Sequence, residues 1–287
     1  MKGKRVHIVG SGPRTGTTLL TEVMKVCFAF DKSCEHEASV YKSNLSFGKY
    51  ETLLTKQPSE LFTVKWPLFF DKNLFVICLV RDPRDMACSY HGDRPDTYWC
   101  SLRYLKLFKR SYHQLKGHPR VLFIKYEDFV NNPDGVQQTI QNKFSFLRIK
   151  HPFSEYHKFA HPDEMTLKAL RNLRPISPSG IGNWKKHLPR IKQQIDLHGD
   201  ISGDLIEMGY EKDKQWLELL NGVEASAFPT ETKEFFSQSE IRKRKRRGYL
   251  TALKIIIEKT GINADRLLYP LTWLNGLIIQ TKSRHKR

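Results

Sequence analysis

Apolar runs alternate with segments of helical spacing along the first half of the chain. Residues 75–80 are an unbroken apolar run, typical of a strand buried on both faces, residues 121–124 are another strand of this buried type, and residues 6–9 are a β-branched apolar run that includes His7. Apolar residues at helical spacing follow, at residues 19–30, 97–115 and 134–149. Residues 61–67 predict a further short strand, which Pro67 ends. This alternation predicts an α/β fold with a central parallel sheet flanked by helices on both faces.

The composition of the chain changes twice after residue 150. Residues 150–190 are rich in histidine, proline and glycine, which predicts a loop or lid, the kind of segment on which functional residues concentrate. A further helix is expected to end near residues 208–210. Beyond Leu220 the composition shifts again. We therefore expect a main domain of residues 1–222 and a basic, amphipathic helical C-terminal extension of residues 223–287.

Residues 6–20 predict a strand, a glycine-rich loop and the start of a helix. The β-branched run ends at Gly10, and Thr17 and Thr18 open the helical pattern. A loop of this kind delivers several backbone N–H groups to a helix N-terminus, where an anion binds. The loop is not a Walker A motif, because Thr17 stands where that motif has its lysine. A cation lies inside the loop instead, Arg14, whose planar guanidinium suits phosphate or sulfate.

Composition favours a globular protein in a reducing compartment. The chain has 287 residues, of which 39% are hydrophobic and 11% aromatic, enough for a full core. Its 5 cysteines are an odd number without a C-x-x-C spacing, which predicts reduced thiols and a cytoplasmic location. The apolar run at residues 6–9 is too short for a signal peptide or a membrane anchor.

Positive charge is concentrated at the C-terminal end. The formal net charge is +18, and residues 240–287 contain 13 Lys/Arg against 3 Asp/Glu. An excess of this kind predicts an acidic partner, which can be nucleic acid, anionic lipid or a polyanionic substrate. No known nucleic-acid-binding motif accompanies the charge, so no nucleic acid is expected as a partner.

The last 40 or so residues combine this charge with apolar side chains. Residues 249–257 place Tyr249, Leu253 and Ile256 on one predicted helix. Residues 267–279 are apolar but too few to span a bilayer, and they have aromatic residues and basic flanks. These features suit the surface of an anionic membrane, with the protein peripheral on its inner face. The alternative is a pair of helices that packs on the core or on a second subunit, as in a homodimer.

Four separated motifs together resemble one enzyme family. The loop at residues 12–20 resembles the 5′-phosphosulfate loop (P-R-S-G-T-T-L) of the Golgi-type and bacterial sulfotransferases. Residues 79–85 with Ser89 are similar to their 3′-phosphate site, which has an arginine at a strand end and a serine eight residues later. Residues 126–129 (Y-E-D-F) resemble their Y-E-D-L element, and residues 182–185 (G-N-W-K) resemble the G-D-W-K of a cofactor-capping loop. Order and spacing agree over roughly residues 5–210.

The resemblance implies a P-loop-like three-layer fold and a sulfuryl transfer. The family transfers the sulfuryl group of 3′-phosphoadenosine 5′-phosphosulfate (PAPS) to a hydroxyl or amine, and it needs no metal. The implied nucleotide-binding residues are Pro13, Arg14, Thr15, Gly16, Thr17, Thr18, Arg81, Ser89, Tyr126, Gly182, Trp184 and Lys185. Two positions depart from the family pattern. Thr15 replaces a serine, and residues 177–179 replace the usual R-K-G, so that Arg174 is a candidate substitute for its phosphate contacts.

The resemblance also implies candidate catalytic residues. The C-G-E-E of tyrosylprotein and several bacterial sulfotransferases aligns with residues 34–37, which places the general base on Glu37. His36 and Glu35 remain alternatives in the same turn. Arg14 is expected to stabilise charge on the transferred group. Lys65, before Trp66-Pro67, matches a K-[T/S]-x-P context in which relatives carry a functional lysine.

The sequence leaves the acceptor open. A carbohydrate or glycolipid hydroxyl is favoured, because the basic net charge suits an acidic or already sulfated glycan. A tyrosine-bearing peptide and a small metabolite are the alternatives within the same reaction class. Two alternatives belong to other functional classes. A non-enzymatic nucleic-acid binder is disfavoured because the sequence has no recognised binding motif, and a P-loop kinase is disfavoured because the Walker lysine is missing.

Overall fold

The computed structural model describes residues 3–42, 44–91, 94–264 and 267. Within this part of the chain, five parallel strands form the central sheet in the order β2-β3-β1-β4-β7. Their bounds are β1 Lys4–Gly10, β2 Lys32–Ser33, β3 Thr52–Lys56, β4 Leu74–Val80 and β7 Val121–Lys125. A separate antiparallel hairpin joins β5 (Tyr90–His91) to β6 (Arg94–Tyr98). The predicted α/β fold with a central parallel sheet is confirmed.

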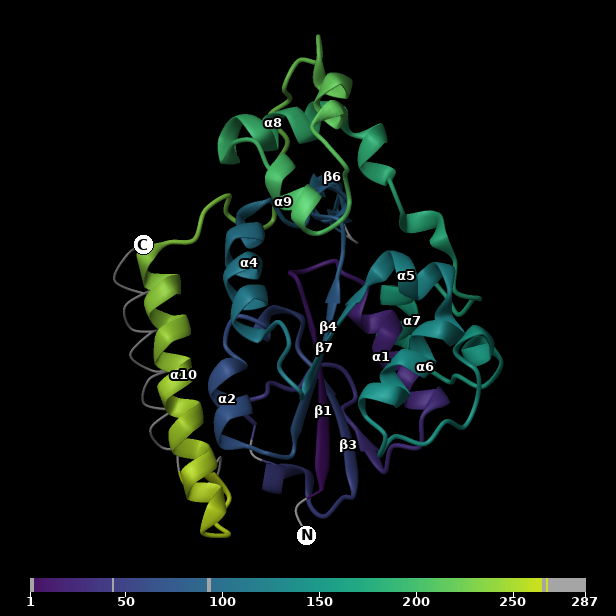
Figure 1. Ribbon diagram of the computed structural model, residues 1–287, viewed down its shortest axis with the longest axis vertical. Helices are drawn as coiled ribbons and strands as arrows, with labels where there is room; N and C mark the ends of the chain where they lie inside the picture. Colours follow the sequence, from purple (N-terminus) through teal and green to yellow (C-terminus); the bar gives the residue numbers. More distant parts are fainter. Residues whose placement is uncertain (1–2, 43, 92–93, 265–266, 268–287) are drawn as a thin grey trace.

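Helices cover both faces of the sheet and its carboxyl edge (Figure 1). One face carries α1 Thr17–Cys27, α5 Tyr126–Asn131, α6 Pro133–Lys143 and α7 Glu164–Leu170. The other carries α2 Lys65–Phe70, α4 Arg103–Leu115 and, outside α2, α10 Gln238–Lys259. The remaining α-helices are α3 Pro83–Ala87, α8 Leu188–His198 and α9 Ser202–Glu207. Short 3-10 helices span Asn44–Phe47, Pro58–Glu60, Phe153–Lys158, Pro178–Gly180, Asn183–Lys186 and Gln215–Leu220.

Strand β1 lies at the centre of the sheet and is buried on both faces. Val6 and Ile8 pack into the apolar cluster on the α1 and α6 side, and Val9 packs into the cluster on the other side. Its two neighbours, β3 and β4, are both parallel to it, with Ile8 opposite Lys56 and Gly10 opposite Leu79. The segments that follow these three strands therefore emerge at one edge of the sheet. This register brings the glycine-rich loop, the end of β3 and the end of β4 together.

The expected strand at residues 61–67 is wrong. Residues 61–64 form a turn that leads into α2, and the sheet neighbour of β1 is β3. Pro67 lies in the first turn of α2, where a missing N–H leaves no helical hydrogen bond unmade. Leu61 and Val64, two of the apolar residues that suggested a strand, pack against the core together with Leu68 of α2.

Other predicted elements hold with shifted ends. The predicted helix at 97–115 begins only at Arg103, because Tyr98 pairs with Tyr90 in the hairpin. The predicted helix at 134–149 ends at Lys143, because Phe144 turns out of helical conformation at φ −122° and packs into the core. The helix expected to end near residues 208–210 is α9, which ends at Glu207. Residues 150–190 are not a plain loop, since they include α7 and three short 3-10 helices.

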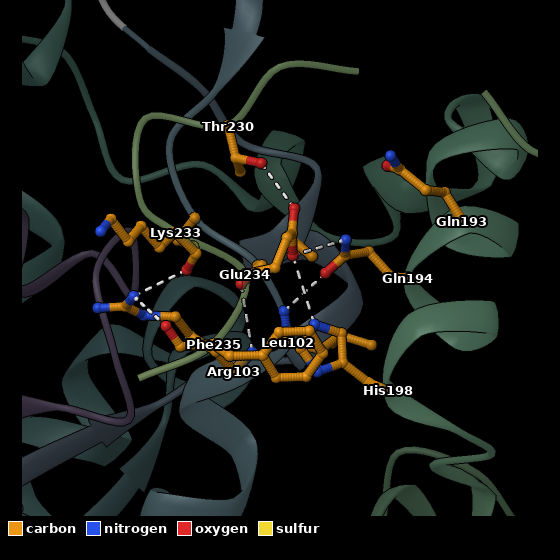
Figure 2. A network of polar contacts seen from close by, with 12 residues as sticks. Leu102, Arg103, Gln193, Gln194, His198, Thr230, Lys233, Glu234 and Phe235 are labelled. Atoms are coloured by element: carbon orange, nitrogen blue, oxygen red, sulfur yellow. Dashed lines mark hydrogen bonds and ion pairs between the residues drawn. The ribbon is translucent and has the colours of Figure 1, made fainter. Parts of the chain in front are cut away.

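Residues 230–235 are tied to α8 and α4 by a polar network (Figure 2). The carboxylate of Glu234 accepts hydrogen bonds from Thr230 and Gln194 and lies 3.4 Å from His198 Nε2. Burial opposes the charged form of Glu234, but these partners and Arg190 outweigh it and lower its pKa to about 2. Arg103 adds hydrogen bonds from its Nη1 to the carbonyls of Lys233 and Phe235.

Helix α10 packs on the core through one face. Its Lys254 Nζ donates to the Tyr41 carbonyl at 3.0 Å, and the Asn44 N–H donates to Glu258 Oε1 at 2.9 Å. Near its N-terminus, Glu240 pairs with Arg103 at 3.3 Å. The packing expected as one alternative for this helix is thus observed. The apolar segment 267–279 lies outside the described residues except for Leu267.

Two further expectations concern membrane spans and cysteines. Among the described helices, none is both long and apolar enough to cross a membrane. All five cysteines, Cys27, Cys34, Cys78, Cys88 and Cys100, are free and buried. Burial raises the pKa of the Cys27 thiol to about 12, so this thiol stays protonated and unreactive near neutral pH.

Candidate functional site

A cleft of about 610 Å³ opens at the carboxyl edge of the central strands. The glycine-rich loop forms its floor, the end of β4 and the α3 region one wall, and residues 169–183 another. Arginine is prominent in its lining, which includes Arg14, Arg81, Arg171 and Arg174. The carboxylates in the lining are Glu37 and Asp85. A cleft with this balance of charge suits an anionic ligand.

The loop between β1 and α1 presents backbone N–H groups to the cleft. Gly16 caps α1 at φ +90°, and no side chain occupies the cap, so the first-turn N–H groups of α1 are left for a ligand. A Cβ on Gly16 would lie 2.8 Å from the Tyr126 ring, which keeps this position free of a side chain. Thr17 and Thr18 line the cleft beside the cap. The geometry is that of an anion cradle.

Another part of the cleft contains three residues that are joined by hydrogen bonds, Arg14, Ser89 and Arg81. Arg14, itself at φ +67°, donates from Nε to Ser89 Oγ at 2.8 Å. Arg81 donates to the carbonyl of Arg14 at 2.9 Å and to that of Gly180 at 2.6 Å, and its guanidinium lies 4.5 Å from the Tyr126 ring centroid. Within the described part of the chain, Arg81 Nε is buried without a hydrogen-bond partner. Burial, helped by Arg171 and Arg81, lowers the pKa of Arg14.

Asp85 holds the segment that closes the cleft. Its two carboxylate oxygens accept the N–H groups of Gly182 at 2.8 Å and Trp184 at 2.9 Å. Burial raises the pKa of Asp85, against these two hydrogen bonds. The Trp184 ring is buried under the Arg84 guanidinium, 4.0 Å away, and contributes to the core instead of the cleft. The glycine and tryptophan of the G-N-W-K motif thus act through their backbone.

Lys56 and Glu37 lie close together beside the glycine-rich loop between β1 and α1 (residues 11–16), which we call the phosphate loop. Lys56 Nζ donates to Thr18 Oγ1 at 3.1 Å and lies 4.0 Å from Glu37 Oε1. The Lys56 side chain is 7% exposed, whereas that of Glu37 is 46% exposed and lines the cleft. Burial lowers the pKa of Lys56, and the carboxylate of Glu37 partly restores it. Lys56 does not itself line the cleft, but it reaches Thr18, which does, so β3 supplies a lysine beside the start of α1.

A buried polar chain fixes the loop that carries Glu37. Arg5 Nε donates to Thr55 Oγ1, which lies 2.8 Å from His7 Nδ1. His7 Nε2 lies 3.2 Å from Glu60 Oε2, and Glu60 accepts the Ser39 hydroxyl and the Val40 N–H. Burial, the largest influence, opposes the charged form of Glu60, but the hydrogen bonds outweigh it and lower its pKa.

The three candidate bases differ in whether they line the cleft. Glu37 faces the cleft. His36 Nδ1 lies 3.9 Å from Asp163 Oδ2 at the start of α7, and the carbonyl of Glu35 accepts a hydrogen bond from Lys25. Neither Glu35 nor His36 lines the cleft. The side-chain placement favours Glu37 for a role at the bound ligand.

The structure brings most of the predicted nucleotide-binding residues into the cleft. Those that line it are Pro13, Arg14, Gly16, Thr17, Thr18, Arg81, Ser89, Tyr126 and, beyond them, Arg174. The predicted nucleotide-binding residues that do not line it are Thr15, Gly182, Trp184 and Lys185, and the candidate catalytic residue Lys65 does not line it either. Thr15 is buried and donates to the Gly12 carbonyl at 3.2 Å, so its hydroxyl shapes the loop. Lys65 is exposed at the first position of α2.

Sequence reasoning missed three residues of the site. Lys56 precedes Gln57-Pro58, so the pattern of a lysine shortly before a proline was present at two places in the chain. Arg171 directly follows α7, has a backbone φ of +55° and lines the cleft. Asp85 belongs to the motif at residues 79–85, but its hold on residues 182–184 could not be read from spacing. In the described residues, no group of three or more His, Cys, Asp or Glu side chains is arranged to hold a metal ion.

Comparisons with known proteins find similar folds and no similar sequence. No protein-family model and no curated protein matches the chain. Among solved structures, mouse sulfotransferase SULT7A1 complexed with PAP is 18% identical, with a TM-score of 0.44 over 72% of this chain and 88% of that one. The sulfotransferase domain of the Synechococcus PCC 7002 olefin synthase is 16% identical, with a TM-score of 0.42 over 64% of this chain and 89% of that one.

A third structure is a retinol dehydratase in complex with androsterone and inactive cofactor PAP. It is 14% identical, with a TM-score of 0.35 over 70% of this chain and 80% of that one. At such identities and scores an activity does not transfer from one protein to another. The function of this chain has to follow from the residues of its own site.

Proposed function

We propose that this protein is a sulfotransferase that uses PAPS as the donor and an acceptor hydroxyl as the nucleophile. The observation that carries the proposal is the meeting of Lys56 and Glu37 at Thr18, beside the phosphate loop. Lys56 contributes a cation at the Thr18 hydroxyl, and its ion-pair partner Glu37 contributes a carboxylate that lines the cleft, so charge stabilisation and a proton acceptor lie close together. Both are needed when an oxyanion group passes to a neutral hydroxyl.

The cleft residues fit a nucleotide with phosphates at two positions. The uncapped N-terminus of α1 suits the 5′-phosphosulfate, whose oxygens would accept the loop N–H groups. Arg81 and Ser89 suit the 3′-phosphate, and the unpartnered Nε of Arg81 leaves a donor for it. Contacts of this kind would discriminate PAPS from ATP, which has no 3′-phosphate. We therefore assign PAPS as the donor and leave the reaction without a metal requirement.

The chemistry assigned to the chain is an in-line transfer. The bond between sulfur and the 5′-phosphate oxygen breaks, a bond from sulfur to the acceptor oxygen forms, and the acceptor proton passes to Glu37. The negative charge that remains on the leaving phosphate is stabilised by Lys56 and the loop N–H groups. The hydroxyl of Thr18, in the first turn of α1, accepts a hydrogen bond from the Lys56 ammonium and holds it in position.

We assign the acceptor to carbohydrates or glycolipids. Tyr90 and Trp99 line the same cleft, and aromatic side chains are common in the lining of small-molecule sites. The net charge of +18 attracts an acidic or sulfated glycan. A tyrosine-bearing peptide and a small metabolite are the competing acceptors for the same site.

A thermal-shift series tests the donor. The product nucleotide 3′-phosphoadenosine 5′-phosphate (PAP) should raise the melting temperature more than ATP or an oligonucleotide at the same concentration. Equal shifts with PAP and ATP would count against the 3′-phosphate site, and a larger shift with the oligonucleotide would favour a nucleic-acid binder.

Sulfate transfer tests the reaction. Wild-type protein with radiolabelled PAPS and fractionated lysate should label one class of molecule, and Glu37→Gln should not. Label in glycans or glycolipids supports the assigned acceptor, and label in peptides reassigns it to tyrosine. Label that is equal with both proteins would show that Glu37 is not the base.

A further inference from the structure

Helix α10 has an exposed face that is separate from the cleft. Its N-terminal half exposes Arg242, Lys243 and Arg247, and its C-terminal half exposes Tyr249, Leu253 and Ile256. The three apolar residues are 72%, 44% and 51% exposed. Their spacing of three and four residues places them on one stripe of the helix. Arg242, seven residues before Tyr249, extends this stripe, and Lys243 and Arg247 are exposed together on one flank of the helix. We call the six exposed residues the outer face of α10.

The acidic residues of α10 are turned toward the core. Glu240 is bonded to Ser237 and Arg103, and Glu258 is buried, where it accepts the Asn44 N–H. Glu240 and Glu258 are the carboxylates in the sequence of this helix. The outer face therefore presents positive charge and apolar side chains without acidic residues among them.

The exposed apolar surface continues from α10 onto α2. Gly248 lies against the Trp66 ring, so close that a Cβ there would be 2.8 Å from Trp66 Cδ1. Trp66 is 44% exposed, and Phe69, one turn further along α2, is 72% exposed. Figure 1 shows α2 and α10 side by side on one side of the molecule. Aromatic and aliphatic side chains from two helices thus extend the apolar part of this surface.

We propose that the outer face of α10 docks the protein on an anionic lipid bilayer. The cationic half matches the headgroup charge, and the apolar half can enter the region between headgroups and acyl chains. A helix that lies flat on the surface satisfies both, because its core-facing side remains bound to α2, to Tyr41 and to Asn44. The protein is then peripheral, on the leaflet that carries anionic lipid.

Two other occupants fit this face less well. A nucleic acid would pair with the cations but would leave Leu253 and Ile256 in water, since aliphatic side chains offer bases no stacking surface. A second copy of the chain, related by a two-fold axis, would bring the cation-rich halves of the two helices into one interface with no carboxylate between them. Like charges so placed oppose association.

The test uses the full-length protein and sedimentation with vesicles. Vesicles of phosphatidylcholine with phosphatidylserine are compared with vesicles of phosphatidylcholine alone. We expect binding to the first, weakened by salt, and little binding to the second. A basic residue near such a surface contributes about 1 kcal/mol, or roughly fivefold in the partition coefficient. The triple variant Arg242→Gln, Lys243→Gln, Arg247→Gln should therefore bind on the order of 100-fold more weakly.

Matched variants on other faces separate this surface from general charge and hydrophobicity. Lys143→Gln, Arg148→Gln, Lys150→Gln removes three exposed cations from the opposite side of the sheet and should leave binding unchanged. Leu253→Ser should weaken binding about tenfold, whereas Leu197→Ser on α8, also 44% exposed, should not. The thermal shift with PAP should be the same in all four variants, which shows that each is folded.

Three results would overturn the proposal. Equal loss of vesicle binding in the two charge triples would show that net charge, not α10, attracts the lipid. Equal binding to vesicles of both compositions, not weakened by salt, would show that the positive charges of α10 do not recognise anionic lipid. A monomer–dimer equilibrium that Leu253→Ser abolishes, without vesicle binding, would assign the face to a second copy.

Discussion

The ammonium of Lys56 lies 4.0 Å from the carboxylate of Glu37 because the loop before Ala38 runs along the end of β3. The Cys34 N–H donates to the Leu54 carbonyl, and the Ala38 N–H donates to the Lys56 carbonyl. Glu37 is thus held between two backbone hydrogen bonds that belong to the strand carrying its partner. This pairing fixes the candidate base and the candidate cation relative to each other and to the phosphate loop.

Glu37→Gln should lower kcat by about 10²–10⁴-fold, the usual contribution of a general base. The amide keeps the shape of the carboxylate but cannot accept the acceptor's proton. Affinity for PAP, measured by calorimetry, should hardly change. Glu35→Gln and His36→Asn are the matched controls in the same turn, and each should cost much less. A large loss in His36→Asn alone would move the base to the imidazole.

Lys56→Met should reduce kcat/KM by about 10–150-fold, because a hydrogen bond to a charged group is worth about 1.5–3 kcal/mol. Lys65→Met should have little effect, since Lys65 is exposed on α2, whereas Lys56 is hydrogen-bonded to Thr18 in the cleft lining. Each variant replaces one lysine by methionine, and the two lysines are less than ten residues apart in the sequence. Any difference in their steady-state kinetics therefore reports the position of the lysine in the structure, not the loss of charge itself. A larger loss at Lys65 would contradict the placement of the functional lysine on β3.

Arg81→Ala and Arg14→Ala should each weaken PAP binding by about 1.5–3 kcal/mol. The loss at Arg81 should be much smaller for adenosine 5′-phosphosulfate, which lacks the 3′-phosphate. Lys185→Ala is the control from the G-N-W-K motif, because its side chain does not line the cleft. Calorimetry with the two nucleotides measures all of these. Unchanged PAP affinity in both arginine variants, with the fold intact, would rule out the assigned donor site.

Acid should destabilise the protein through His7 and Glu60. Burial lowers the pKa of His7 below its usual 6.5, so the unfolded chain takes up a proton first and stability falls as pH drops below about 6.5. The pKa of Glu60 is lowered from 4.5 by its hydrogen bonds, which adds a second loss as pH falls below that value. Urea denaturation from pH 7 to pH 4 measures the slope. His7→Gln should flatten its upper part, and a slope equal to wild type would contradict this assignment.

Two glycine substitutions should change stability in opposite directions. Gly248→Ala should destabilise by about 1 kcal/mol, because the new Cβ would be 2.8 Å from the Trp66 ring and the rigid indole would have to move. In α9, a Cβ at Gly203 would have no atom within 4 Å, so Gly203→Ala should stabilise the protein by roughly a few tenths of a kcal/mol through helix propensity. Thermal denaturation checks the pair. Stabilisation by both would mean that α10 does not pack closely on α2.

The sequence by itself determined three strands of the parallel sheet and the loop that follows the first of them. β4 is a continuous apolar run, because a central parallel strand has no solvent side on which a polar residue could alternate. β1 is also central and includes the buried His7, and β7, at the edge of the sheet, is apolar over residues 121–124. The glycines and threonines of the phosphate loop are set by local backbone demands, such as φ +90° at Gly16. The cleft arginines follow from that framework, since Arg81 comes directly after the predicted strand 75–80 and Arg14 lies in the loop after the predicted strand 6–9.

Only the tertiary structure decided which residues meet at the site. Lys56 and Lys65 both precede a proline, and nothing local distinguishes them. The parallel pairing of β3 with β1, with Lys56 opposite Ile8, places one beside the phosphate loop and leaves the other on α2. Glu35, His36 and Glu37 likewise differ only in direction, which the hydrogen bond from Ala38 to Lys56 sets. Such long-range backbone pairing depends on residues far away in the chain, so spacing within a motif cannot specify it.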